Sequence, residues 1–600
     1  MKNKNRELLI YIVIIVLQVL VILYWANVKV NYHIDELYSM GYASNFTHNG
    51  DIGQYITTSP DFKFGEWVSN SDLKKHLIVS ETERASRLPA GTLLKKLITN
   101  RNYMILLNIA ESIAGLSYVS SAPGLCLNLI FFVIAEVMLI RLMKKLDMDE
   151  KVRYLALFMF GFSGYMISAA LYIRFYMLVI MIMLVILNCF YKLWISDNWK
   201  DIIFLEFAIV VLTYLSYKNS ELTIPFFCSI MCGVIPALII TKKRKQLFVS
   251  LAVCMLGTIY VFTLTPIIEI MLHPETYENQ MFVGVSASFA IHNSSISTIT
   301  NYLIWVKELF EMLYFNSRTL LYVFLGVVTI ALIATNNKEN SNGIGDYFKR
   351  INPVVWLSFV IWIVILTISK EMGHGVFISL LVLFCIVVIG LLQAFGRKLQ
   401  LQEIINSPEA IFVSVIAVEA VLYTIFDAVC EFAIWRYYCF GFVSVIIVLW
   451  FLIDRILKRD FLKKANPKLI VVITAFVILN ALATFLTRNV ENIYEDEKVF
   501  VNSVRANSEL DVVLVTAYDE GVISRHDTYD CVNMIPETAN VFITDIADYE
   551  YSKIDYPDDF MLWTHEGRDI SPILNDLSRN GYNIEDLGSD HCSKAYICRH

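Results

Sequence analysis

Residues 8–25 read LLIYIVIIVLQVLVILYW, and this stretch determines the class of the fold. It carries no charge, and its length is close to the roughly 20 apolar residues that an α-helix needs to cross a bilayer. Lys2, Lys4 and Arg6 come directly before it. Because positive charge collects on the cytoplasmic side and no small-residue cleavage site follows, we expect an uncleaved first span whose N-terminus faces the cytoplasm.

Similar apolar runs recur along most of the 600-residue chain. Hydrophobic residues make up 56% and charged residues 18%, whereas soluble domains average about 45–50% and 25%. The mean hydropathy is +0.56. This composition excludes an ordinary soluble protein and a disordered one. We predict a polytopic helical membrane protein with thirteen spans, near residues 8–25, 123–142, 154–171, 175–195, 201–216, 222–240, 247–271, 318–335, 353–369, 376–395, 409–427, 437–453 and 468–487.

The basic residues between these runs predict the orientation. Clusters of Lys and Arg follow the second, sixth and twelfth spans, at residues 141–153, 242–245 and 455–464. The short connections on the other side are nearly free of Lys and Arg. The positive-inside rule therefore predicts a multi-pass protein of the cell membrane, with the N-terminus in the cytoplasm and the C-terminal region outside it.

The two ends of the chain differ in charge. The segment 488–600 contains 23 acidic and 9 basic residues, whereas residues 1–487 include 33 acidic and 40 basic residues. We expect a transmembrane domain at 1–487, with a long first outer loop at 26–122, and an extracytoplasmic α/β domain at 488–600. A basic transmembrane domain is usual in membrane proteins and does not indicate binding to nucleic acid.

The tail alternates between strand-like and helix-like patterns. Predicted strands cover 511–516, 540–545 and 560–563, and a predicted helix at 571–580 ends at Gly581. Cys531, Cys592 and Cys598 also lie in the tail, and an extracytoplasmic location would permit one disulfide among them. In the outer loops, 103–116 is too short for a span and suggests a juxtamembrane or re-entrant helix, and 302–314 is a second amphipathic piece.

Four basic residues lie at the outer ends of spans, against the general charge asymmetry. They are Arg174, Lys218, Lys370 and Arg436, each beside aromatic residues. One interpretation is that they are interfacial anchors, with the apolar stem in lipid and the charge in water. The other is that they line a cleft that binds a phosphate or pyrophosphate group. Four such residues on one face favour the second interpretation for at least two of them.

An acidic pair, Asp35-Glu36, follows the first span in the run Tyr32-His33-Ile34-Asp35-Glu36-Leu37-Tyr38. It is either an exposed pair in a loop or a carboxylate that acts as a general base near the outer membrane face. Three further carboxylates lie within spans, at Glu136, Glu206 and Glu419. Each costs about 2.5–3.5 kcal/mol at the bilayer centre unless it is paired or faces a cavity. They indicate structural pairing or, alternatively, a transport path.

The order of these features resembles the GT-C fold glycosyltransferases, in particular the protein O-mannosyltransferase and aminoarabinose-transferase branch. In that family an acidic pair opens a long first outer loop, as Asp35-Glu36 does here. Residues 169–178, AALYIRFYML, resemble the branch's ARxYxL stretch, although Tyr172-Ile173 stand where an acidic residue commonly precedes the arginine. Leu215-Ser216-Tyr217-Lys218 lies where the branch has a polar aromatic motif, and Trp435-Arg436-Tyr437-Tyr438 resembles its late RY motif.

The resemblance implies an inverting enzyme that moves a sugar from a polyprenyl-phosphate carrier to an extracytoplasmic acceptor, which would be a glycan, a lipid or a protein. Asp35 would be the general base, and Glu36 would orient the loop or the acceptor. Arg174 and Arg436 would bind the phosphate. Further candidates for contacts to the sugar or phosphate are Tyr176, Lys218, Lys370, His374 and Tyr437. Membrane lipids are expected partners. No cofactor and no metal ligands are predicted, and a need for a divalent metal stays open.

Two other functions remain alternatives. A transporter or flippase for a lipid-linked glycan would have polar groups near the middle of the membrane and two related halves, and no half-repeat is visible. A non-catalytic membrane scaffold would act through its outer tail and would tolerate Asp35→Asn.

Overall fold

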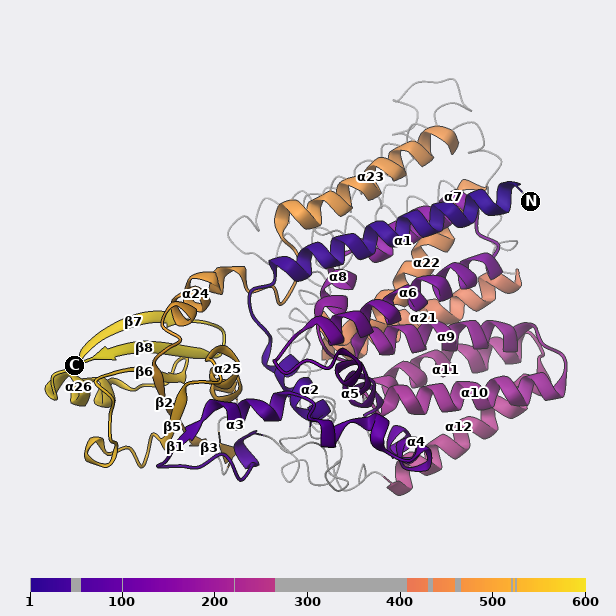
Figure 1. Ribbon diagram of the computed structural model, residues 1–600. Helices are drawn as coiled ribbons and strands as arrows, with labels where there is room; N and C mark the ends of the chain where they lie inside the picture. Colours follow the sequence, from indigo (N-terminus) through magenta and orange to yellow (C-terminus); the bar gives the residue numbers. More distant parts are fainter. Residues whose placement is uncertain are drawn as a thin grey trace, which may run out of the picture. The chain divides into compact units, whose positions relative to one another are not determined.

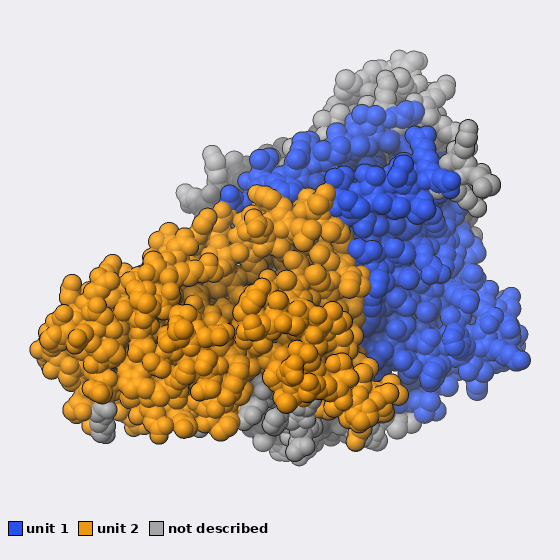
Figure 2. Space-filling view, in the orientation of Figure 1, with its two compact units in different colours: residues 1–18, 133–167, 179–490 blue, residues 19–132, 168–178, 491–600 orange. Residues whose placement is uncertain are grey.

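The computed structural model describes residues 2–44, 56–99, 101–220, 222–264, 407–429, 435–458, 466–519, 522–523 and 526–600 (Figure 1). The chain forms two compact units (Figure 2). Unit 1 contains residues 1–18, 133–167 and 179–490, and unit 2 contains residues 19–132, 168–178 and 491–600. Each unit is therefore assembled from segments that are far apart in the sequence.

Long apolar helices build unit 1. They are α1 (Lys2–Val28), α6 (Ala122–Lys145), α7 (Glu150–Gly161), α9 (Tyr176–Ile195), α10 (Trp199–Tyr217), α11 (Thr223–Ile240), α12 (Arg244–Leu264), α21 (Pro408–Val429), α22 (Cys439–Leu457) and α23 (Asn466–Thr487), of which α1, α6 and α9 extend into unit 2. Within the described residues, seven helices are long and apolar enough to cross a membrane. This confirms the predicted polytopic helical membrane protein. The total of thirteen spans stays a prediction, because the three between 318 and 395 lie outside the described residues.

The predicted span at 154–171 is not one straight helix. It consists of α7 and α8 (Gly164–Leu171), which are bent by 52° at a short break. Ser163 explains the break, because its Oγ donates a hydrogen bond to Phe160 O (2.7 Å) and accepts one from Met166 N (3.2 Å). A side chain that replaces backbone partners in this way caps one helix and starts the next.

The basic connections gather at one end of the helix bundle in unit 1. Arg153 donates a 2.9 Å hydrogen bond to Glu7 near the N-terminus, and Lys458 after α22 lies 3.7 Å from Asp147 after α6. Lys243 after α11 donates to the carbonyl near the end of α9. The connections that follow α6, α11 and α22 therefore share one end with the N-terminus, as the predicted topology requires.

The three carboxylates within predicted spans are buried in unit 1. Glu136 and Glu419 are fully buried, and Glu206 is 2% exposed. Ser250 Oγ donates a hydrogen bond to Glu206 Oε1. Gly161 packs closely against the carboxyl group of Glu136, because a Cβ there would displace the side-chain ends of Gln18 and Glu136. The carboxyl groups thus lie among packed helices.

A six-stranded sheet forms the centre of the tail in unit 2. Its strands are β1 (Trp67–Ser69), β2 (Asp511–Thr516), β5 (Asn540–Asp545), β6 (Asp559–His565), β7 (Asn583–Ser589) and β8 (Ser593–Arg599), in the order β1-β5-β2-β6-β8-β7. The inner strands β5, β2 and β6 run parallel, and β1, β8 and β7 pair antiparallel. A two-stranded ribbon of β3 (Tyr518–Asp519) and β4 (Val522–Ile523) follows β2. The helices of the tail are α24 (Lys498–Ala506), α25 (His526–Met534) and α26 (Ser571–Arg579).

The predicted tail elements agree with this α/β structure. The strands at 511–516 and 540–545 are found at those bounds, and β2 is buried along almost its whole length, as expected for a central parallel strand. The predicted helix at 571–580 is α26. Gly581 follows it with a φ of +99°, a backbone conformation that favours glycine.

One strand of this sheet comes from the long first loop. Trp67 in β1 pairs with Phe542 in β5, and the centres of their rings lie 5.4 Å apart. The side-chain amide of Asn70 donates hydrogen bonds to Val532 O and Ile535 O, at 3.2 and 3.0 Å. The first loop and the tail therefore fold as one unit, and the pairing covers an edge of the sheet.

The first loop also forms α2 (Ile34–Ser44), α3 (Asn70–Lys74), α4 (Ala90–Thr99) and α5 (Asn102–Ala114). Helix α5 corresponds to the predicted short helix at 103–116, has 13 residues and ends at Gly115, whose φ is +63°. The second amphipathic piece, 302–314, lies outside the described residues.

The tail cysteines do not form the disulfide that an oxidising location would permit. Cys531, Cys592 and Cys598 are free and buried. Cys598 lies in β8 within the hydrophobic core of the tail, and burial raises the pKa of its thiol to about 12. These cysteines therefore serve as small apolar packing residues.

Candidate functional site

The acidic pair begins a helix. Asp35 and Glu36 lie in the first turn of α2, where the positive end of the helix dipole favours carboxylates. His33 precedes the helix, and its Nδ1 accepts a hydrogen bond from Asp35 N at 3.1 Å. In return, Glu36 Oε2 accepts one from His33 N at 2.9 Å. This reciprocal capping fixes the backbone that carries Asp35.

Arg174 contacts the same turn, although it lies 139 residues further along the chain. Its Nη2 donates to Asp35 Oδ1 at 3.1 Å, and its Nη1 donates to Asp35 O and Ser39 Oγ, each at 3.1 Å. The side chains of Arg174 and Asp35 are 12% and 20% exposed. Partial burial strengthens their attraction while one side of the pair stays accessible.

Tyr172 and His33 complete the surroundings of Asp35. Tyr172 Oη lies 2.9 Å from Asp35 Oδ2 and 2.9 Å from His33 Nδ1. Because His33 Nδ1 already accepts from Asp35 N, the hydrogen-bond network assigns its proton to Nε2. Nδ1 has one lone pair in the plane of the ring, and Asp35 N already uses it, so the hydroxyl group of Tyr172 donates to Asp35 Oδ2. Neither Tyr172 nor His33 was among the predicted site residues, although both lie within the motifs that were quoted for Asp35 and Arg174.

Glu36 differs from Asp35 in its surroundings. It is fully buried, Lys29 Nζ lies 2.5 Å from its Oε2, and Ile173 N donates to its Oε1 at 2.9 Å. Protein donors therefore bind both carboxylate oxygens. The bond to Ile173 joins the turn that carries Asp35 to the residue that precedes Arg174. Glu36 is therefore closed off from solvent, whereas the side chain of Asp35 is 20% exposed. The orienting role of Glu36 stays a prediction.

Tyr176 follows Arg174 at the start of α9. It is 3% exposed, and the centre of its ring lies 5.8 Å from that of Tyr172, with the rings nearly parallel. Tyr176 thus packs against the tyrosine that contacts Asp35. Its contact to a substrate stays a prediction.

The other predicted residues that the structure describes belong to unit 1. The Arg436 guanidinium carbon lies 5.6 Å from the centre of the Tyr437 ring, and Tyr165 Oη donates to Arg436 O at 3.5 Å. Lys218 follows α10, with its Nζ 5.4 Å from the ring of Tyr214. Arg436 precedes α22, and Lys458 with the basic connection follows it. Lys370 and His374 lie outside the described residues.

A pocket lies beside α2 in unit 2. Its lining includes Met40, Leu77, Val79, Glu111, Tyr118 and Pro123. Burial raises the pKa of Glu111 to about 8, so that this carboxyl group is mostly protonated at neutral pH. The pocket is therefore mostly uncharged at neutral pH, and the hydrogen-bonding groups of Glu111, Tyr118 and Ser120 lie among its apolar side chains.

Comparison with solved structures finds two that align along 98% of the chain. Both are crystal structures of ArnT from Cupriavidus metallidurans, and the alignments cover 97% of each. The one bound to undecaprenyl phosphate is 10% identical with a TM-score of 0.38, and the apo one is 13% identical with a TM-score of 0.37. No protein-family model and no curated protein matches the sequence.

TM-scores below 0.5 do not define a fold, and sequence identities of 10% and 13% do not transfer a function. The function has to be inferred from the residues of this chain.

Proposed function

We propose that the protein is a membrane glycosyltransferase that moves a sugar from a polyprenyl-phosphate carrier to a hydroxyl group of an extracytoplasmic acceptor. The observation that carries the proposal is the pair of Asp35 and Arg174, whose side chains lie 3.1 Å apart and are mostly buried. A carboxylate and a guanidinium group in one site match the two requirements of this reaction, a base for the acceptor and a cation for the leaving phosphate.

Asp35 is the proposed base. The acceptor oxygen forms a bond to the anomeric carbon of the sugar while Asp35 takes the hydroxyl proton, and the bond between that carbon and the phosphate oxygen breaks. Attack from the side opposite the phosphate inverts the anomeric configuration. A positioned base of this kind contributes about 10²–10⁴ in rate.

Arg174 is the proposed partner of the leaving phosphate. Cleavage leaves the electron pair on the phosphate oxygen, and a guanidinium group donates paired hydrogen bonds to such oxygens. Its present bonds to Asp35 and Ser39 hold it in place before the substrate binds. Preorganised charge avoids rearrangement during the reaction and is often the largest catalytic contribution.

Tyr172 and Glu36 are proposed as positioning residues. Tyr172 donates to Asp35 Oδ2 and so fixes the orientation of the carboxylate, and the second lone pair of that oxygen is able to accept the proton of the acceptor. Glu36 holds the base-bearing turn through Lys29 and Ile173. For Arg436, Tyr437, Lys218, Lys370, His374 and Tyr176, a role in binding the donor rests on the sequence motifs. The cell membrane, the orientation of the termini and the polyprenyl-phosphate donor belong to the same proposal.

The test compares a deletion strain that expresses the wild type, Asp35→Asn or Asp72→Asn. Asp72 is an exposed acid in the same loop and serves as a matched control. Mass spectrometry of envelope glycans should show that one sugar modification is lost in the deletion strain and with Asp35→Asn but is restored by Asp72→Asn. The carrier-linked sugar should accumulate on the outer leaflet. Full restoration by Asp35→Asn would refute the assigned base, and accumulation on the cytoplasmic leaflet would favour a flippase.

A further inference from the structure

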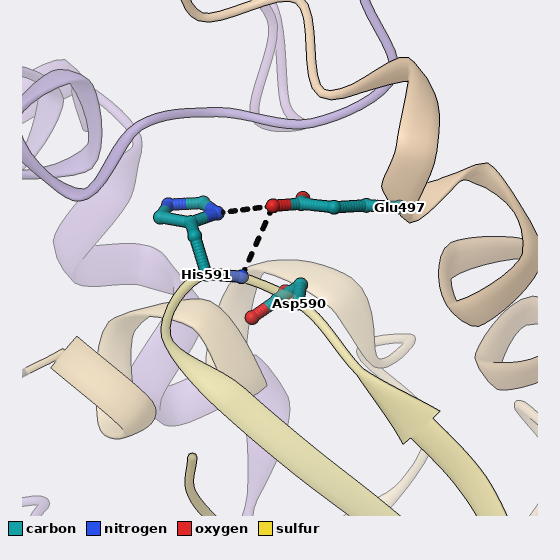
Figure 3. Close-up of side chains that lie close together, drawn as sticks. All are labelled: Glu497, Asp590 and His591. Atoms are coloured by element: carbon teal, nitrogen blue, oxygen red, sulfur yellow. Dashed lines mark hydrogen bonds and ion pairs between the residues drawn. The ribbon is translucent and has the colours of Figure 1, made fainter. Parts of the chain in front are cut away.

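A second group of polar side chains lies in unit 2 and takes no part in the proposed reaction. Glu497 ends a 3₁₀ turn at Glu495–Glu497, Asp590 and His591 lie in the turn between β7 and β8, and Asp530 lies in α25. We call these four residues the Glu497 cluster. Candidate ligand atoms of Glu497, Asp590 and His591 lie within 4.8 Å of one another (Figure 3).

The imidazole of His591 is oriented toward the carboxylates. Its Nδ1 lies 2.7 Å from Glu497 Oε1, which also accepts a hydrogen bond from His591 N at 3.0 Å (Figure 3). The ring of Tyr494 stacks on the imidazole at 4.2 Å, with an angle of 11° between the planes. These contacts fix which ring nitrogen faces the Glu497 cluster.

Acidic side chains outnumber basic ones in the Glu497 cluster. Glu497, Asp530 and Asp590 are 7%, 2% and 4% exposed. In the part of the chain that the structure describes, His591 is the only basic side chain that forms an ion pair with any of these three carboxylates. Burial of several like charges is unfavourable unless a cation or a proton compensates them.

Asp530 provides a second observation that points to a cation site. Its Oδ2 is buried, and none of the described residues supplies a hydrogen-bond partner for it. Its carboxyl group lies within hydrogen-bonding reach of the Asp590 carboxyl group, which has no hydrogen to donate when ionised. Two buried carboxyl groups within hydrogen-bonding reach of each other are stabilised by a shared proton or by a cation that both bind.

We propose that the Glu497 cluster binds a divalent transition-metal ion of the Zn²⁺ type. One imidazole nitrogen with carboxylate oxygens is a common ligand set for Zn²⁺, and Mg²⁺ and Ca²⁺ prefer oxygen ligands alone. Nδ1 of His591 and Oε1 of Glu497 would separate to roughly 3.3 Å, the spacing of two ligands at about 2.05 Å in a tetrahedral site. His591 is the most exposed member of the Glu497 cluster and leaves an entry path for the ion.

A residue of the first loop, Asn31, contacts two members of the Glu497 cluster. Asn31 Nδ2 donates to Glu497 Oε2 at 3.1 Å and to Asp590 Oδ2 at 3.2 Å. Hydrogen bonds of this kind orient the ligands of metal sites. Asn31 is two residues from His33, so the ion ties the segment before α2 to the tail. The inference does not depend on the proposed function, because the ion has no assigned part in sugar transfer.

The test uses the full-length protein in detergent, stripped with a chelator and then titrated with Zn²⁺ against a competing metal indicator. The wild type should bind about one equivalent of Zn²⁺ per chain, and His591→Asn or Glu497→Gln should weaken this binding about tenfold or more. His76→Asn is the matched control, because His76 forms another imidazole–carboxylate pair, with Asp61 at 3.0 Å, in the same unit. Mg²⁺ and Ca²⁺ should not displace Zn²⁺.

Three further measurements test the ligands, the link to the first loop and the folding of the variant. X-ray absorption of the Zn²⁺-loaded wild type should show one imidazole and several oxygen ligands, and Zn²⁺ should slow hydrogen exchange at residues 29–36. Thermal unfolding without metal should show that His591→Asn is folded. If the stripped wild type takes up no Zn²⁺, or if His591→Asn and Glu497→Gln bind it as tightly as the wild type, the carboxylates share protons only and the proposal is wrong.

Discussion

Tyr172 Oη lies 2.9 Å from Asp35 Oδ2 and equally far from His33 Nδ1. Tyr172 precedes Arg174 by two residues, in the stretch where the family that the sequence resembles commonly has an acidic residue. A neutral hydroxyl group at this position adds no second negative charge beside Asp35, and it donates a hydrogen bond to Asp35 Oδ2. The carboxylate of Asp35 is thus held by one cation, Arg174, and one hydroxyl donor, Tyr172.

Tyr172→Phe should lower kcat for sugar transfer about tenfold, because a hydrogen bond to a charged group contributes about 1.5–3 kcal/mol. The KM for the carrier lipid should change little, since the phenol contacts the base and not the proposed phosphate site. Steady-state kinetics with purified enzyme measures both quantities. Tyr556→Phe loses a hydroxyl bond of the same length, 2.9 Å to Tyr549, in the tail and should behave as the wild type. Equal kcat for the two variants would exclude a role of Tyr172 in positioning.

Glu36→Ala should destabilise the protein by about 3–5 kcal/mol, because Lys29 would keep its charge without a partner in a buried site. The side chains of Lys29 and Glu36 are 8% and 0% exposed. Lys29→Met combined with Glu36→Ala should recover part of the loss. Thermal unfolding of the four proteins in one detergent forms a double-mutant cycle. Strictly additive effects would show that the ion pair does not hold the turn.

Arg436→Ala should mainly weaken binding of polyprenyl phosphate. Loss of a charge-assisted contact worth about 1.5–3 kcal/mol corresponds to at least a tenfold rise in Kd. Turnover at saturating carrier should fall less than with Arg174→Ala, because Arg174 contacts the base as well. Lys192→Ala is the control for a general loss of positive charge. Lys192 lies in the last turn of α9, at the end of the helix bundle that carries the basic connections. Carrier binding that is unchanged in Arg436→Ala would remove this residue from the donor site.

The sequence predicts those helices and strands whose residue pattern lies within one continuous segment. The apolar run at 8–25 forms α1, and the pattern that ends at Gly581 forms α26. Pairing between distant segments has no such signal. The three residues of β1, Trp67–Ser69, are too few to show a strand pattern, and they form a strand because they pair with the edge of β5. The bend at Ser163 is equally hidden, since it depends on the hydrogen bonds of one side chain within an apolar run.

The candidate site is predicted in part for the same reason. Asp35 and Arg174 stand out as charges at the ends of spans, and the order of the motifs suggests that they meet. The distinct environments of Asp35 and Glu36 are not visible in the sequence, because Lys29 and Ile173 make Glu36 structural only through tertiary contacts. The Glu497 cluster is missed altogether, since its members lie on separate elements without a metal-binding spacing.

Stability should fall as the pH rises from about 4.5 to about 8, through the titration of Glu111. Burial raises the pKa of Glu111 from 4.5 to about 8. Within this window the folded protein keeps a proton that the unfolded chain has released, so each increase in pH favours unfolding. Glu111→Gln removes this titration and should flatten the dependence of the unfolding midpoint on pH. Glu66→Gln, at an exposed position in the same unit, should leave the slope unchanged. If the unfolding midpoints of the wild type and Glu111→Gln depend on pH in the same way, the carboxyl group of Glu111 is hydrated. The pocket beside α2 would then carry a negative charge at neutral pH.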